Sequence, residues 1–253
     1  MTYLHSGLFA SHILFGSLAL ILFWVPLFTK KGQLNHTRFG NHYKVSMYLV
    51  ALSGAIMALM VLAFPVVIKG EYINNASNPE RATYVIRLFW AFLLYLSLLS
   101  FTVTRHATAV IAAKQNRKSL QKLSYLLPII ALITAAPVLF YYGFIASQTL
   151  LMVFAVLGLV VGFGMLRYCI KAQVAERQWL FEHIGSFIGS GIGAYTAFIA
   201  FGARTVFEGL GAWQIIFWIA PGLIGSIASA FLCKKYGKLY GIKPVITSKS
   251  AQA

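Results

Sequence analysis

Residues 7–28, GLFASHILFGSLALILFWVPLF, contain no lysine, arginine, aspartate or glutamate. A helix of this length can cross the hydrocarbon core of a bilayer, which is about 30 Å thick. The start of the chain also lacks the basic residues and the cleavage site of a removable signal peptide. This stretch therefore predicts a transmembrane helix that stays in the protein.

Segments of the same kind recur along the whole chain. It has 253 residues, of which 59% are hydrophobic and 10% are charged, whereas soluble domains carry roughly a quarter charged residues. Each run of about 20 apolar residues is long enough for one crossing. We therefore predict an all-α, polytopic membrane bundle in which residues 1–253 form one domain. Its seven transmembrane helices are expected at 7–28, 45–68, 84–103, 123–146, 148–166, 184–203 and 213–233.

The distribution of positive charge predicts the orientation of this bundle. Lysine and arginine number four in residues 29–44, five in 104–122, three in 167–183 and five in 234–253, which is seventeen of the 21 in the chain. Such an excess is typical of cytoplasmic loops. We expect the N-terminus outside and the C-terminus in the cytoplasm of a bacterial inner membrane. The net charge of +16 then indicates anionic inner-leaflet lipid as a partner, and not nucleic acid.

The acidic residues exclude several kinds of site. The sequence has no aspartate, and its five glutamates all lie outside the predicted spans. A paired-carboxylate active site, a carboxylate relay through the bilayer and an all-oxygen Ca²⁺ or Mg²⁺ site each need acids that the spans lack. The last span also has no lysine for a retinal Schiff base.

Histidines near the cytoplasmic ends of the spans are the main candidates for a site. His42 precedes the second span, His106 follows the third and His183 precedes the sixth, so all three are expected at one membrane level. Imidazoles from three helices could ligate a soft transition metal or haem iron. His36, in the loop before His42, is a fourth candidate for holding the cofactor. The alternative is that each is a solvated interfacial histidine.

Two further ionisable residues lie inside predicted spans. His12 lies about five residues into the first span, and Arg87 lies at a similar outer depth in the third. An ionisable side chain within the bilayer is a functional hypothesis by default. The alternative is that neutral His12 donates a hydrogen bond to a neighbouring helix, while Arg87 extends outward to the interface.

The sixth span carries small residues at a spacing of four. In HIGSFIGSGIGAYTAF, residues 183–198, Gly185, Gly189 and Gly193 lie on one face. In lipid, such a face lets another backbone approach closely, either within the bundle or in a second copy of the chain. It could also form a smooth wall for a flat ligand such as haem, a quinone or an acyl chain. The spacing leaves both interpretations open.

Three motifs resemble a family of bacterial predicted membrane proteins whose function is unknown. They are HIxxGxxAL at 12–20, the loop KKGQLNHTRFGNHYKVSM at 30–47, and the segment 183–198 quoted above. The family pairs a histidine in the first helix with a KGxxxHRxxGxxY loop and a late HIxxMxxxIxxxTAF helix. Here Thr37 separates His36 from Arg38, and Phe187 stands where the family often has methionine. The resemblance implies membership but no activity.

Three functions remain open from the sequence. The first is a redox-type membrane protein that holds haem or a soft metal with the cytoplasmic histidines. The second is a non-enzymatic transporter or lipid-binding protein that uses the small-residue face of the sixth span. The third is a metal-dependent lipid hydrolase, whose general base would be Glu182 or Glu176.

Overall fold

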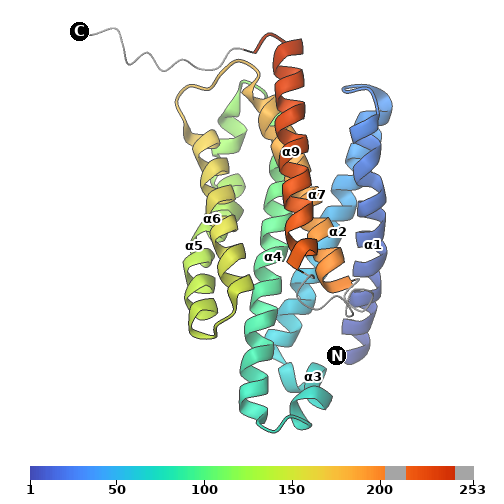
Figure 1. The fold of residues 1–253 in the computed structure, drawn as a ribbon, viewed down its shortest axis with the longest axis vertical. Helices are drawn as coiled ribbons and strands as arrows, with labels where there is room; N and C mark the ends of the chain where they lie inside the picture. The colour runs from blue at the N-terminus through green and yellow to red at the C-terminus, as the bar shows by residue number, and fades with distance from the viewer. Residues whose placement is uncertain (203–214, 243–253) are drawn as a thin grey trace, which may run out of the picture.

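A computed structural model describes residues 1–202 and 215–242 of the chain. Within these residues every regular element is helical and no strand is present, so the predicted all-α class is confirmed (Figure 1). The elements are α1 (Thr2–Phe28), α2 (Leu34–Ala63), α3 (Pro65–Asn74), α4 (Pro79–Ala113), the 3₁₀ turn η1 (Arg117–Gln121), α5 (Leu123–Ile145), α6 (Thr149–Ile170), α7 (Gln178–Ala197), the π segment η2 (Phe198–Gly202) and α9 (Ile215–Leu239).

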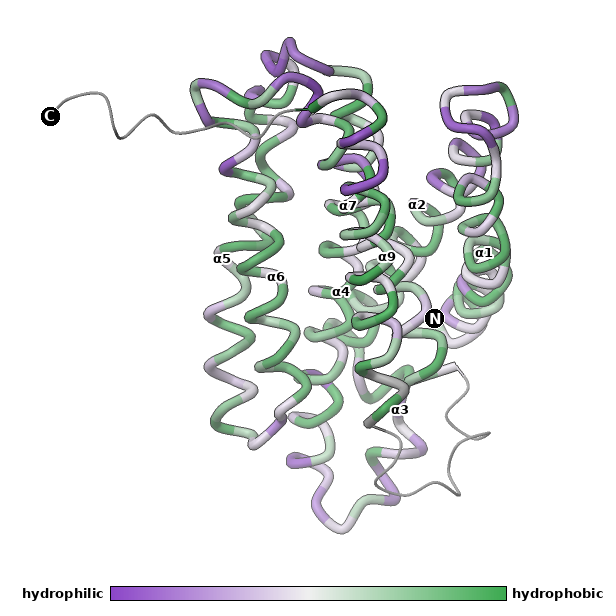
Figure 2. The backbone as a smooth tube through the Cα atoms, turned by 45° about the horizontal axis from the view of Figure 1, so that its top comes forward, coloured by the Kyte–Doolittle hydropathy of each residue, from purple (hydrophilic) through white to green (hydrophobic). Residues whose placement is uncertain are grey.

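Six helices in the described residues are long and apolar enough to cross a membrane, which indicates a membrane-embedded protein. They are α1, α2, α4, α5, α6 and α7, the last counted with η2. Large apolar side chains are exposed along them. Figure 2 shows that the middle of these helices consists mostly of hydrophobic residues. The seventh predicted span, 213–233, begins outside the described residues, and α9 is not among the six. Seven spans therefore stay a prediction.

The helices form two groups that meet at α4. On one side, α1 packs on α2 and α7 packs on α9, and both α2 and α7 contact α4. On the other side, α5 and α6 form a hairpin that contacts α4 and η1 (Figure 1). The largest buried cluster joins α4 to this hairpin, and a smaller cluster joins α1, α2 and α7. α4 thus lies between the two groups of helices, each of which has its own buried cluster.

The second span differs from its predicted bounds at both ends. Its helix begins at Leu34, so the histidine-containing segment that we expected as a loop is helical. It ends at Ala63, because Phe64 has φ −129° and ψ 58° in front of Pro65. Proline disfavours the helical conformation in the residue before it and cannot donate a backbone hydrogen bond. The chain then continues as the separate helix α3.

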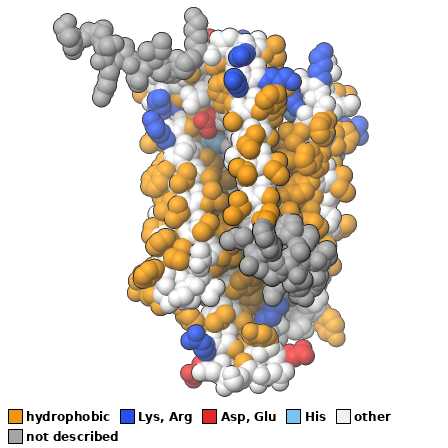
Figure 3. Space-filling model, viewed as in Figure 1, with side chains coloured by type: hydrophobic (Ala, Val, Ile, Leu, Met, Phe, Trp, Pro, Cys, Tyr) orange, Lys and Arg blue, Asp and Glu red, His pale blue; other side chains and the backbone are white. Residues whose placement is uncertain are grey.

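One end of the bundle collects most of the positive charge. The C-terminal ends of α1, α4, α6 and α9 lie at this end (Figure 1), and lysine and arginine side chains gather there (Figure 3). Arg117 is buried there and donates hydrogen bonds to the main-chain oxygens of Tyr168 and, at 2.6 Å, of Lys171. It therefore ties η1 to the carbonyl end of α6, where a cation is favourable.

Candidate functional site

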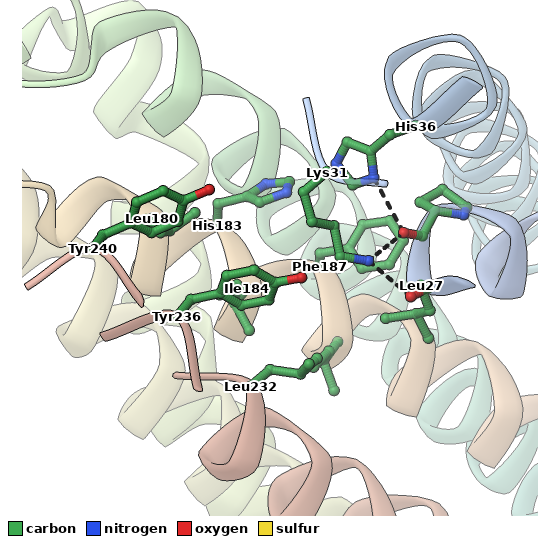
Figure 4. Close-up of a pocket in the computed structure, with 12 residues that line it drawn as sticks. Leu27, Lys31, His36, Leu180, His183, Ile184, Phe187, Leu232, Tyr236 and Tyr240 are labelled. Carbon is green, nitrogen blue, oxygen red and sulfur yellow. Dashed lines mark hydrogen bonds between the residues drawn. The ribbon is translucent and has the colours of Figure 1, made fainter. Parts of the chain in front are cut away.

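A pocket opens at the basic end of the bundle, where α1, α2, α7 and α9 meet. It encloses about 70 Å³. Most of its wall is apolar, and its polar groups are one lysine, two histidines and two tyrosines, with no acidic residue among them (Figure 4). The residues that line it are Pro26, Leu27, Lys31, His36, Leu180, His183, Ile184, Phe187, Ile188, Leu232, Tyr236 and Tyr240.

Lys31 bends back over the end of α1. Its Nζ donates to the main-chain oxygens of Pro26 at 2.6 Å and Leu27 at 2.8 Å, as the dashed lines of Figure 4 show. The last carbonyls of a helix have no partner within it, so a lysine there is favourable. The left-handed turn at Gly32, with φ 76°, follows directly. An ammonium has three donors, so one N–H of Lys31 is left for a ligand.

Burial lowers the pKa of Lys31, and the positive charge of Lys235 lowers it further. Both effects disfavour the protonated amine, because neither desolvation nor a like charge is compensated by an acid. An anion in the pocket would reverse this effect. The electrostatics of Lys31 therefore indicate a site in which negative charge is favourable.

The rings of His36 and His183 are held in the same way. His36 Nδ1 lies 3.1 Å from the main-chain oxygen of Pro26, and His183 Nδ1 lies 2.7 Å from that of Ala107. A carbonyl only accepts, so in both rings Nδ1 carries the proton and donates it. In the neutral ring Nε2 is then free to accept a hydrogen bond or bind a metal. The two ring centroids are 6.4 Å apart.

The predicted joint site of His42, His106 and His183 is not formed in the described residues. No group of three or more His, Cys, Asp or Glu side chains lies there in a way that could hold a metal ion. His42 is exposed and contacts the ring of Phe39. His106 is fully buried and faces Tyr125 and Tyr168. His183 instead donates to the main-chain oxygen of Ala107, so each of the three rings has contacts of its own.

His36, which we ranked fourth, is the histidine that lies beside His183. It does so because α2 begins early, at Leu34, and its first turn therefore faces α7. Lys31 was missed as a site residue, since we counted it only among the charges that set the orientation. Its position five residues after Pro26, at the end of a span, is the feature that indicates helix capping.

His12 and Arg87 do not form a pair. His12 Nδ1 lies 3.0 Å from the hydroxyl of Ser53 in α2. That hydroxyl donates its proton to the main-chain oxygen of Leu49 at 2.7 Å, so His12 is the donor. This is the interhelical hydrogen bond that the sequence left open as the alternative. Arg87 is exposed on α4.

The glycines of α7 pack differently from the expectation. A Cβ added to Gly185 or Gly193 would meet no described atom within 4 Å, and one at Gly189 would make ordinary contact with Val103 at 3.7 Å. The tight position is Gly191, where a Cβ would overlap the ring of Phe23. The face of α7 that packs on α1 is therefore the stripe Phe187, Gly191 and Tyr195.

Comparison with known proteins adds no assignment. No protein-family model matches the chain, and no significant match was found among the curated proteins or the solved structures. The family resemblance of the three motifs therefore stays a prediction, and function has to be argued from the site.

Proposed function

We propose that this protein is an integral membrane protein that binds an anionic amphiphile, such as a lipid with a phosphate headgroup, in the pocket of Lys31, His36 and His183. The observation that carries the proposal is the free N–H of a partly buried lysine above an apolar wall that has no acid. A buried cation without a counter-ion is costly, and an anionic ligand would supply the missing charge.

The histidines strengthen the same site. Both Nδ1 atoms already donate to main-chain oxygens, so protonation would turn each Nε2 into a donor aimed at the ligand. A bound oxyanion would favour this protonation, and hydrogen bonds to charged groups are roughly twice as strong as neutral ones. An enclosed volume of about 70 Å³ suits a headgroup and not a whole lipid.

The apolar wall supplies the place for the tail. Leu180, Ile184 and Ile188 follow one face of α7, and Leu232 faces them from α9 (Figure 4). Ile184 and Ile188 are buried, whereas Leu180 and Leu232 are partly exposed, so an acyl chain would leave the headgroup past Leu180 and Leu232. We also propose that the basic end is cytoplasmic, with the N-terminus outside in a bacterial inner membrane, which would place the pocket at the level of anionic headgroups.

Lipid titration tests the proposal with two matched variants. The protein in a neutral detergent is titrated with phosphatidic acid, phosphatidylcholine or inorganic phosphate, and the bound lipid is measured by native mass spectrometry. We expect phosphatidic acid to bind well above phosphatidylcholine. Lys31→Met should lower that affinity at least about tenfold, since one charge-assisted hydrogen bond contributes about 1.5–3 kcal/mol. Lys30→Met, next in the chain but exposed, should leave it unchanged.

Three results would contradict the proposal. Equal binding of the two lipids would mean that headgroup charge is not recognised. Equal losses in Lys30→Met and Lys31→Met would mean that only the general charge of this end matters. Binding of inorganic phosphate with the affinity of phosphatidic acid would show an anion site in which the apolar wall takes no part.

A second candidate is a haem- or soft-metal-binding protein that uses the His36 and His183 pair. The observation in its favour is that each Nδ1 donates to a carbonyl, which is the arrangement that orients metal-binding imidazoles. The 6.4 Å between ring centroids is a separation that two ~2 Å metal–nitrogen bonds can bridge. A Soret band, or stoichiometric metal that is lost in His183→Gln, would favour this candidate. If protein purified with added haemin and zinc shows neither a Soret band nor bound metal, this candidate is excluded.

A further inference from the structure

A second polar cluster lies where α4 meets the α5–α6 hairpin, beside Glu182 of α7. Its centre is His106, whose side chain is 0% exposed. The hydroxyl of Tyr125 lies 2.7 Å from His106 Nδ1, and the ring of Tyr168 lies 5.8 Å from the histidine ring in an edge-on arrangement. Glu182 Oε2 lies 3.6 Å from His106 Nε2. None of these groups lines the pocket described above.

Counting donors and acceptors assigns the proton of His106. The Tyr125 hydroxyl has one proton, and its hydrogen bond in the protein is the one to His106 Nδ1. If Tyr125 donates, Nδ1 accepts and the neutral ring carries its proton on Nε2. The reverse would leave a buried phenol proton without an acceptor, which is costly. His106 Nε2 is therefore a donor, which is the opposite of His36 and His183.

This donor has no hydrogen-bond partner among the described residues. His106 Nε2 is buried without a hydrogen bond, because 3.6 Å to Glu182 is too long for one. The hydroxyl of Tyr168 is also buried without a partner. Nearly all buried polar groups are hydrogen-bonded in native proteins. Two donors of this kind around one glutamate indicate a place for an oxygen that accepts hydrogen bonds.

The cluster can be reached from the lipid. In the described residues the α5–α6 hairpin packs on α4 and η1, and not closely on α7 or α9. Figure 3 shows a hollow between apolar side chains in which acidic and histidine atoms are visible. The side chain of Glu182 is 24% exposed and marks the way in. His106 Nε2 and the Tyr168 hydroxyl are buried beneath it, so a ligand would have to part the side chains that cover them. A ligand that dissolves in the bilayer could enter sideways between the two groups of helices.

We propose that His106 and Tyr168 form a second binding site, which takes the carbonyl oxygen of an uncharged, lipid-soluble molecule. A carbonyl oxygen has two lone pairs and could accept from both Nε2 and the hydroxyl. The ligand is uncharged because the carboxylate of Glu182 would repel an anion at His106. Two cations lie beside the cluster, and both already donate to carbonyls. Arg117 donates at the end of α6, and Arg105, over the ring of Tyr125, donates to the main-chain oxygen of Ser124. This site is independent of the proposed anion pocket.

Decylubiquinone is the probe for this site, and decylbenzene, which has a similar tail but no carbonyl, is the control ligand. Binding to the full-length protein in detergent is followed by the shift in thermal unfolding temperature and by titration calorimetry. We expect saturable binding of the quinone and none of decylbenzene. Tyr168→Phe should weaken quinone binding about threefold to tenfold, the effect of one neutral hydrogen bond, without lowering the unfolding temperature of the free protein.

Tyr95→Phe is the matched control. The hydroxyl of Tyr95 is also buried without a partner, but it lies against Gly158 inside the interface of α4 and α6. This variant should bind the quinone as the unmodified protein does. The proposal is overturned if the quinone does not bind, or if Tyr168→Phe and Tyr95→Phe weaken it equally. It is also overturned if Tyr168→Phe lowers the unfolding temperature of the free protein, because the hydroxyl would then hold a structural water.

Discussion

Glu182 and His183 are neighbours in the sequence but face two different interiors. The ring of His183 lies beside that of His36 of α2, and its Nδ1 donates to the main-chain oxygen of Ala107 in α4. Glu182 lies beside His106 on the α4 and α6 side, where a tyrosine holds the ring in the other tautomer. Histidines at one membrane level thus present an acceptor to one side and a donor to the other. The partner of Nδ1, and not the depth in the membrane, decides what each can bind.

The largest effect is expected where α7 is fixed to α1. In Gly191→Leu the new side chain would overlap Phe23, which packs against Phe187 and Tyr195. Overpacking a tight contact costs about 1–3 kcal/mol or more. We expect a loss of about 3 kcal/mol in the free energy of unfolding, together with loss of anionic lipid binding in the pocket. Unfolding in a graded denaturing detergent measures the first, and native mass spectrometry the second.

Gly185→Leu is the control for this prediction. A Cβ at Gly185 meets no described atom within 4 Å, so the change in unfolding free energy should stay within about 0.5 kcal/mol. If Gly185→Leu destabilises the protein as much as Gly191→Leu does, the packing face of α7 is the one expected from the small-residue spacing. The assignment of Gly191, and not Gly185, to the packed face of α7 would then be wrong.

The next largest effect is expected at the buried histidine. His106→Ala removes a fully buried ring and leaves the Tyr125 hydroxyl without its partner. Cavity formation and an unsatisfied buried hydroxyl together predict a loss of about 3 kcal/mol in the free energy of unfolding. His42→Ala, at an exposed position, should change it by less than about 0.5 kcal/mol. Similar losses in both variants would mean that the two histidines share one site after all.

The smallest effect is the pH dependence of the anion pocket. The pKa of Lys31 is lowered by burial and by Lys235, so this lysine loses its proton at a lower pH than a solvated lysine does. Anion binding needs the protonated amine and should therefore weaken as the pH rises toward the ordinary lysine pKa, beginning below it. We expect up to about a tenfold fall in phosphatidic acid affinity for the unmodified protein. Lys31→Arg should remove most of this fall, because arginine stays protonated.

Much of the fold follows from the sequence. Apolar runs of about 20 residues predicted the helices, but not all of their ends. α2 begins eleven residues before its predicted start and α4 ends ten residues after its predicted end, because polar residues continue these helices beyond the apolar run. At Pro65 local chemistry ends the helix early. The sites were only partly predictable. His183 was a candidate and does line the pocket, but its neighbours His36 and Lys31 come from the residues before and at the start of α2. The pairing of His106 with Tyr125 joins residues nineteen positions apart across η1.

The sequence by itself determined that the chain is helical, apolar and strongly basic outside its spans. Only the tertiary structure decided how each helix is rotated, and therefore that Gly191 and not Gly189 meets α1, and that His183 meets His36 and not His106. The physical reason is the solvent. In water an apolar stripe marks the buried face of a helix, but a helix in lipid is apolar all round. Its rotation is set by shape and by a few hydrogen bonds, which appear only when the partner helix is in place.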